Sequence, residues 1–187
     1  MRSRGLSVYS LPPDLPEPVD DGAADHLEGL EVPSLTLDSS AGPVDLAELG
    51  AGRAVLYIYP RTGRPDREVP AGWDAIPGAR GCTPQSCGFR DHVADLAKHG
   101  ARVAGLSVQT PDDQRELAER LHIAYPVIAD PERRLGAALD LPTFEFQDVT
   151  LYKRLTLVLE AGRIAKVFYP VFPPDKSAEE VLAWLDS

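Results

Sequence analysis

Short apolar runs bounded by turn residues recur along the chain, and each run predicts a strand of a buried sheet. The predicted strands cover residues 34–38, 54–59, 102–108, 125–129, 155–159 and 164–169. Gly162 lies in the short turn between the last two strands, which therefore form a hairpin.

Apolar residues at spacings of three and four predict helices between these strands. The predicted helices cover residues 44–49, 83–99, 110–121, 132–139 and 177–185. Thr110 with Asp113, and Ser177 with Glu180, match the pattern of a capping box at a helix start. Strands that alternate with helices and end in a hairpin and a helix indicate an α/β protein. We expect a thioredoxin-like fold, in which helices flank a central mixed β-sheet.

Length and composition suggest one folded domain with an N-terminal arm. A chain of 187 residues can bury a sizeable core. Residues 1–27 are rich in proline and acidic, so we expect an arm that lies extended on the domain or is disordered. The domain itself is expected to cover residues 28–187.

The charge pattern excludes several classes of function. A net charge of −10 without clusters of Lys or Arg argues against nucleic acid and anionic membranes as partners. No apolar stretch reaches the ~18–20 residues of a membrane-spanning helix, and the N-terminal apolar segment is too short for a signal peptide. We therefore expect a cytoplasmic protein.

The four histidines are scattered and the cysteine spacing is not a zinc pattern, so we expect no metal.

Both cysteines of the chain lie at one predicted helix start. Thr83 and Pro84 suit the N-cap and first-turn positions, which places Cys82 at the beginning of the helix or one residue before it. Unpaired N–H groups and the positive end of the helix dipole favour a thiolate there. The thiolate is the reactive form of cysteine.

The distance between the two cysteines suggests a redox switch. In an intact helix the Cα atoms of Cys82 and Cys87 would lie roughly 8.6 Å apart, whereas a disulfide tolerates at most about 7 Å. A bond between them therefore requires the helix start to unwind, and Pro84 and Gly88 make that easier. From the residues alone, two inert buried cysteines are an equally good interpretation.

The segment Gly-Cys-Thr-Pro-Gln-Ser-Cys-Gly-Phe-Arg-Asp, residues 81–91, resembles the active-site segment of peroxiredoxins. It is most similar to the peroxiredoxin Q group, also called bacterioferritin comigratory proteins. The resemblance implies that Cys82 is the peroxidatic and Cys87 the resolving cysteine, which form an intramolecular disulfide. It also implies that Arg154 lies beside Cys82. The implied protein reduces peroxides, is itself reduced by thioredoxin or a similar dithiol, and needs no metal, haem or flavin. We also expect it to be a monomer.

The sequence departs from the family upstream of the first cysteine. Peroxiredoxins carry a threonine three residues before the peroxidatic cysteine, where this chain has Ala79. Three possibilities stay open for the hydrogen bond that this threonine provides in the pocket. Thr62 provides it from a distance, Thr83 provides it, or it is lost. Residues 61–81 form an insertion, which we expect to be a surface loop anchored by Trp73. Its last part, residues 76–81, must touch the cysteine.

Two other functions stay open at this stage. One is a thioredoxin-type thiol–disulfide oxidoreductase, which the lack of a Cys-x-x-Cys motif disfavours. The other is a non-enzymatic redox sensor that uses the same switch. If Arg154 does not serve the thiolate, Arg80, Arg90 and Arg61 are the next candidates, although Arg90 also suits a surface pair with Asp91.

Overall fold

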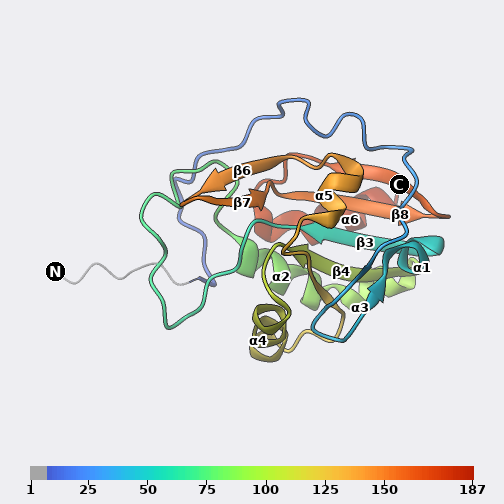
Figure 1. The fold of residues 1–187 in the computed structure, drawn as a ribbon, viewed down its shortest axis with the longest axis horizontal. Coiled ribbons are helices and arrows are strands. Elements are labelled where there is room, and N and C mark those ends of the chain that lie inside the picture. Colours follow the sequence, from blue (N-terminus) through green and yellow to red (C-terminus); the bar gives the residue numbers. More distant parts are fainter. Residues whose placement is uncertain (1–7) are drawn as a thin grey trace.

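A five-stranded mixed sheet forms the centre of the molecule (Figure 1). The computed structural model describes residues 8–187. The strands follow the spatial order β5-β4-β3-β8-β9, and β3, β4 and β5 run parallel while β8 and β9 are antiparallel to their neighbours. Their bounds are β3 Arg53–Ile58, β4 Ala101–Ser107, β5 Val127–Ala129, β8 Leu155–Glu160 and β9 Arg163–Phe168. The expected α/β architecture with a mixed sheet is confirmed.

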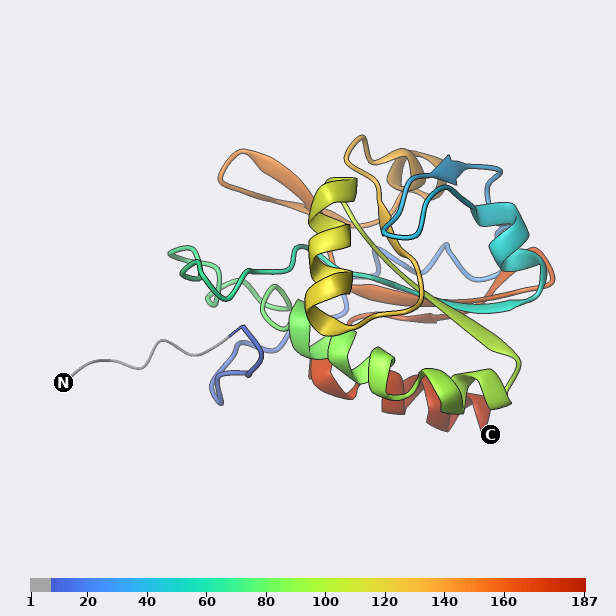
Figure 2. The same ribbon diagram turned by 90° about the horizontal axis from the view of Figure 1, so that it is seen from below.

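Helices cover both faces of this sheet (Figure 2). One face packs against α1 (Leu46–Ala51) and α5 (Arg134–Leu139). The other face packs against four helices, which are α2 (Cys82–Asp91), α3 (Val93–Lys98), α4 (Pro111–Leu121) and α6 (Ser177–Leu185). The remaining elements are β1 (Thr36–Leu37), β2 (Val44–Asp45), β6 (Thr143–Phe146), β7 (Val149–Tyr152) and the 3₁₀ helix η1 (Pro174–Lys176).

Several boundaries differ from the sequence expectation. The helix expected to run to residue 99 is divided at His92, whose φ of −108° and ψ of 8° depart from helical values. The break turns α3, so Phe89 and Leu96 are buried while Val93 is exposed. The capping box at Thr110 is confirmed, but the one at Ser177 is wrong, because η1 runs directly into α6 and Ser177 is its first helical residue.

The described part of the N-terminal arm lies on the domain. Leu27 is fully buried in the core, and the ring of His26 is hydrogen-bonded to the carbonyl of Leu139 at 2.8 Å. Further along the arm, Asp21 accepts hydrogen bonds from Lys153 and Tyr169, which hold the pKa of its carboxyl well below the usual range. The beginning of the arm, residues 1–7, lies outside the described residues.

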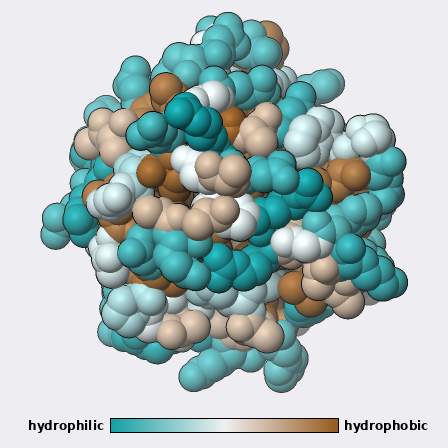
Figure 3. Space-filling model, turned by 90° about the vertical axis from the view of Figure 1, so that its right-hand side faces the viewer, coloured by the Kyte–Doolittle hydropathy of each residue, from teal (hydrophilic) through white to brown (hydrophobic). Residues whose placement is uncertain are grey.

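No helix within residues 8–187 is long and apolar enough to cross a bilayer. On the face seen in Figure 3, hydrophobic side chains are scattered among polar ones.

One glycine in the sheet sets the position of the tyrosine that supports α2. Gly105 is the cross-strand neighbour of Tyr57, and a Cβ atom there would lie 2.7 Å from the Tyr57 ring. Because Gly105 has no side chain, the fully buried ring of Tyr57 can pass over it and reach α2, where its hydroxyl bonds to Ser86.

Gly105→Ala is therefore expected to lower the free energy of unfolding by about 1–3 kcal/mol, because a buried ring cannot yield to an added methyl group. Urea denaturation measures this change. Gly52→Ala is the matched control, since a Cβ at Gly52 meets nothing within 4 Å. Equal stability of the two variants would show that Tyr57 moves freely.

Candidate active site

A left-handed glycine places Cys82 at the first position of α2. Gly81 is the N-cap, with φ of 111°, a conformation that favours glycine. A Cβ atom on Gly81 would also lie 2.8 Å from Pro174 and 2.9 Å from Leu11. Cys82 follows as the first residue of α2, at the positive end of the helix dipole, and only 3% of its surface is exposed.

Thr83 is not the helix cap that the sequence suggested. The N-cap lies two residues earlier, at Gly81, which provides no side-chain hydrogen bond to the helix. Thr83 is instead buried within the first turn, and its hydroxyl oxygen has no hydrogen-bond partner among residues 8–187. Buried hydroxyl groups are normally bonded, so this oxygen is a candidate to bind a ligand.

The guanidinium of Arg154 connects the cysteine to the surrounding backbone. Its Nη2 lies 3.1 Å from Cys82 Sγ and donates to the carbonyls of Ala79 at 3.0 Å and Arg80 at 3.3 Å. Its Nε donates to the carbonyl of Gly78 at 3.3 Å. Only 4% of Arg154 is exposed. The sequence-predicted pair Cys82 and Arg154 is thus brought together by the structure.

Sheet register explains why Arg154 reaches this place. Ile58, the last residue of β3, pairs with Leu155, the first residue of β8. Arg154, which directly precedes β8, therefore lies beside the carboxyl end of β3, where the chain leaves the sheet and continues towards Cys82.

Sequence reasoning missed Gln85, which holds the same guanidinium. Its Oε1 accepts a hydrogen bond from Arg154 Nη1 at 2.5 Å, and its Nε2 donates to Ser177 Oγ at 3.3 Å. The available signal was helical spacing: residue i+3 lies on the same face as residue i, here Cys82.

Cys87 lies on the same helix, one and a half turns further on. It is half-buried, and both cysteines are free thiols in an intact α2. Burial raises the pKa of the Cys87 thiol. The thiol therefore stays protonated at neutral pH, which makes it a weak nucleophile.

Aromatic packing anchors the middle of α2 to the sheet. The ring of Phe89 stacks on Tyr57 at 4.5 Å between centroids and an angle of 3°. The Tyr57 hydroxyl donates to Ser86 Oγ, and Tyr125 donates to the Ser86 carbonyl, both at 3.2 Å. Unwinding α2 past Ser86 must break these contacts.

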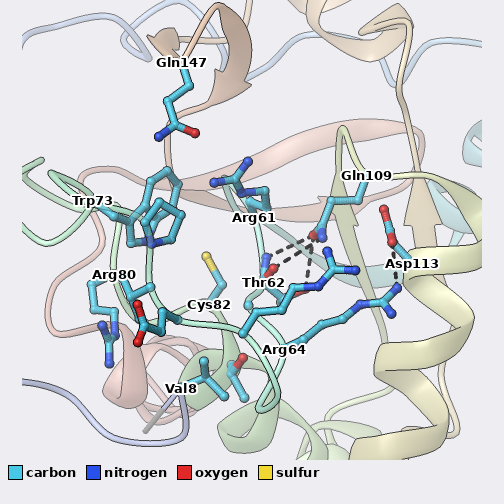
Figure 4. Close-up of a pocket in the computed structure, with 17 residues that line it drawn as sticks. Val8, Arg61, Thr62, Arg64, Trp73, Arg80, Cys82, Gln109, Asp113 and Gln147 are labelled. Atoms are coloured by element: carbon cyan, nitrogen blue, oxygen red, sulfur yellow. Dashed lines mark hydrogen bonds and ion pairs between the residues drawn. The ribbon is translucent and has the colours of Figure 1, made fainter. Parts of the chain in front are cut away.

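A pocket of about 410 Å³ opens above Cys82 (Figure 4). Figure 4 shows the sulfur pointing into it, between Trp73 and Thr62. Residues 61–64 and 67–70 line the pocket, so most of the loop belongs to the site and is not merely the surface loop we expected. Trp73 is the expected anchor: it is 5% exposed and packs on Ala79 and Leu151.

The two hydroxyl candidates differ in their surroundings. Thr62 lines the pocket, but its hydroxyl donates to Gln109 Oε1 at 3.1 Å. Thr83 also lines the pocket, and its hydroxyl is unpaired within the described residues. Ala79 has its side chain in the apolar cluster with Trp73.

The other arginines have different tasks. Arg80 pairs with Asp74 at 2.9 Å. Arg90 pairs with Asp91 at 3.0 Å and donates to the carbonyl of Leu121. Arg61 lies over an aromatic ring of the pocket wall. No group of three or more side chains suited to hold a metal occurs among residues 8–187.

Comparison with known proteins gives the family of the chain. The Redoxin family model matches residues 27–182. The chain belongs to the redoxin family. It is 29% identical over 187 residues to the chloroplastic peroxiredoxin Q of Gentiana triflora, covering 96% of this chain and 78% of that protein.

Solved structures of related proteins have the same fold. The peroxidoxin BcpB of Mycobacterium tuberculosis aligns with a TM-score of 0.70 and 25% identity, over 86% of this chain and 97% of its own. The bacterioferritin comigratory protein of Xanthomonas campestris, studied for alkyl peroxide reduction, aligns with a TM-score of 0.65 and 21% identity, over 92% and 98%. The expected thioredoxin-like fold and the resemblance to peroxiredoxin Q are confirmed.

Arg154→Ala is expected to slow the reaction of the reduced protein with hydrogen peroxide by about 100-fold, because a preorganised donor at the reacting sulfur is lost. Arg154→Lys should recover part of the rate, since it keeps the charge but not the planar fork. Stopped-flow kinetics gives the second-order rate constant.

Lys153→Ala serves as the control, because Lys153 pairs with Asp21 on the surface. An unchanged rate constant in Arg154→Ala would transfer the role to another arginine, with Arg80 first.

Proposed function

We propose that this protein is a thiol-dependent peroxidase that reduces hydrogen peroxide and organic hydroperoxides. The observation that carries the proposal is Cys82 itself, which lies at a helix start, 3.1 Å from a buried guanidinium, and points into a pocket. The cycle begins with Cys82 as peroxidatic cysteine. Its thiolate attacks the terminal peroxide oxygen, an S–O bond forms, and the O–O bond breaks. Cys82 becomes a sulfenic acid, and the departing oxygen takes a proton and leaves as water or an alcohol.

Arg154 and the start of α2 serve this step by stabilising negative charge. The guanidinium contacts the sulfur directly, and the helix N–H groups face the same place. Donors fixed in advance lower the barrier because they need no reorganisation during the reaction.

The Thr83 hydroxyl is our candidate to bind the peroxide. It borders the pocket and lacks a partner within the described residues, whereas the Thr62 proton is already donated to Gln109. Thr83 would thus replace the hydroxyl that is absent at Ala79.

Cys87 then resolves the sulfenic acid. Because the two Cα atoms lie roughly 8.6 Å apart in a helix, the first turns of α2 must unwind before the disulfide can form. Condensation of the Cys87 thiol with the sulfenic acid forms the S–S bond and releases water. Unwinding also relieves the burial that holds Cys87 protonated.

An external dithiol, thioredoxin or a similar protein, then reduces the disulfide by exchange. Both cysteines belong to one helix, so no second chain is needed for the cycle, and we propose that the protein acts as a monomer.

Cys82→Ser is expected to abolish peroxide consumption in a thioredoxin-coupled assay and to leave the fold intact. Cys87→Ser should keep the first oxidation, accumulate sulfenic acid and progress to sulfinic acid with excess peroxide. Mass spectrometry with a sulfenic-acid probe follows both products. Full activity of Cys82→Ser would disprove the peroxidase assignment, and normal turnover of Cys87→Ser would exclude Cys87 as the resolving residue. A wild-type protein that reacts with one equivalent of peroxide but does not turn over with thioredoxin would be a redox sensor and not a peroxidase.

Oxidation is expected to reduce hydrogen-exchange protection in residues 83–92, because the disulfide cannot form across an intact α2. Phe89 should leave its stack on Tyr57 at the same time. Strands β3 and β4 should keep their protection in both forms and provide the internal control. Equal protection of residues 83–92 before and after oxidation would show that no unwinding takes place.

A further inference from the structure

Arginines gather around the pocket above Cys82 although the protein is acidic. The chain has a net charge of −10, yet four arginines line this pocket. They are Arg61, Arg64, Arg67 and Arg80. Two carboxylates also line it, Glu68 and Asp113. Arg64 is paired with Asp113 at 3.0 Å and lies 3.9 Å from Glu116, and Arg80 is paired with Asp74 at 2.9 Å. Arg61 and Arg67 form no ion pair among residues 8–187, and Glu68 is the remaining carboxylate of the lining. These two arginines therefore leave one positive charge in excess, which can attract an anion.

Arg61 is the arginine best prepared to bind that anion. Its guanidinium lies 5.1 Å from the ring centre of Trp73 and 5.7 Å from that of Phe146. No carboxylate within residues 8–187 forms an ion pair with it. The aromatic rings contact the flat faces of the guanidinium, so the N–H groups at its edge remain available. Two of these N–H groups can bind the two oxygens of a carboxylate at the same time. Figure 4 shows Arg61 beside Trp73, on the side of the pocket towards which the Cys82 sulfur points.

The pocket also has room and apolar surface for an organic group. Its volume of about 410 Å³ lies in the range of sites for small organic ligands. Val69, Pro70 and Trp73 supply apolar wall. Hydrogen peroxide would leave most of this space and the Arg61 cation unused.

We propose that the preferred substrate is an organic hydroperoxide that carries a carboxylate, with the carboxylate bound by Arg61. This inference rests on the proposed peroxidase function. The carboxylate pairs with the guanidinium, the organic part contacts Trp73, and the hydroperoxide group reaches Cys82. The thiolate bonds to the terminal oxygen, the O–O bond breaks, and the substrate leaves as the corresponding hydroxy acid after taking a proton. Cys82 is oxidised to sulfenic acid and the hydroperoxide is reduced by two electrons.

The test compares one hydroperoxide in charged and neutral forms. The probes are cumene hydroperoxide with a para-carboxylate and the methyl ester of the same compound. We measure kcat/KM for both with wild type, Arg61→Gln and Arg61→Lys. In wild type the acid should react about tenfold faster than the ester, the order of one charge-assisted contact. The ratio should fall close to one in Arg61→Gln and recover in part in Arg61→Lys.

Arg115→Gln is the matched control, because it removes the same charge from the exposed side of α4 and should keep the wild-type ratio. A wild-type ratio of one, or a ratio unchanged in Arg61→Gln, would overturn the inference. If Arg61→Gln fails to fold, the wild-type ratio at low and high salt decides, since a carboxylate contact must weaken with salt. A wild-type protein that turns over neither the two probes nor hydrogen peroxide would refute the peroxidase function itself, so the two failures are distinct.

Discussion

The buried guanidinium of Arg154 is the contact on which the site depends. A buried cation is costly unless its charge is balanced and its N–H groups are bonded. Three backbone carbonyls and the Gln85 side chain bond to it, but no carboxylate does within residues 8–187. Among its contacts, Cys82 Sγ is the atom that can carry a negative charge. The guanidinium is therefore placed to stabilise negative charge on this sulfur by direct contact.

The same helix must satisfy two opposite demands. Attack on a peroxide needs Cys82 fixed at the start of α2, and disulfide formation needs that start to open. The contacts of Ser86 and Phe89 with Tyr57 oppose the opening, while Pro84 and Gly88 weaken the helix itself. Such a segment is expected to open at a free energy between zero and that of global unfolding. The packing of α2 on the sheet therefore sets the balance between reaction and resolution.

The sequence predicted the fold and the chemical centre better than the surroundings of that centre. Apolar periodicity is a local signal, so the central strands and most helices were found. The segment around Cys82 was found because its residue types and spacing are distinctive. The roles of Gln85 and Arg61 depend on contacts between distant segments, as with Gln85 and Arg154. The helix break at His92 was missed because Val93 and Leu96 fit a continuous period while only Leu96 is buried. Thr83 was misplaced as a cap because a left-handed glycine leaves no side-chain signal of its own.

Arg154 holds the loop before Cys82 through main-chain oxygens of Gly78, Ala79 and Arg80. A carbonyl is present whatever the side chain, so these contacts constrain the path of the loop and not its sequence. The strict requirement falls on Gly81, where no side chain fits. A substitution at these three positions therefore leaves the carbonyls that bind Arg154 in place, whatever it does to the packing of the loop. At position 81 any side chain would collide with Pro174 and Leu11, so this one residue fixes how the backbone enters the helix that carries the cysteine.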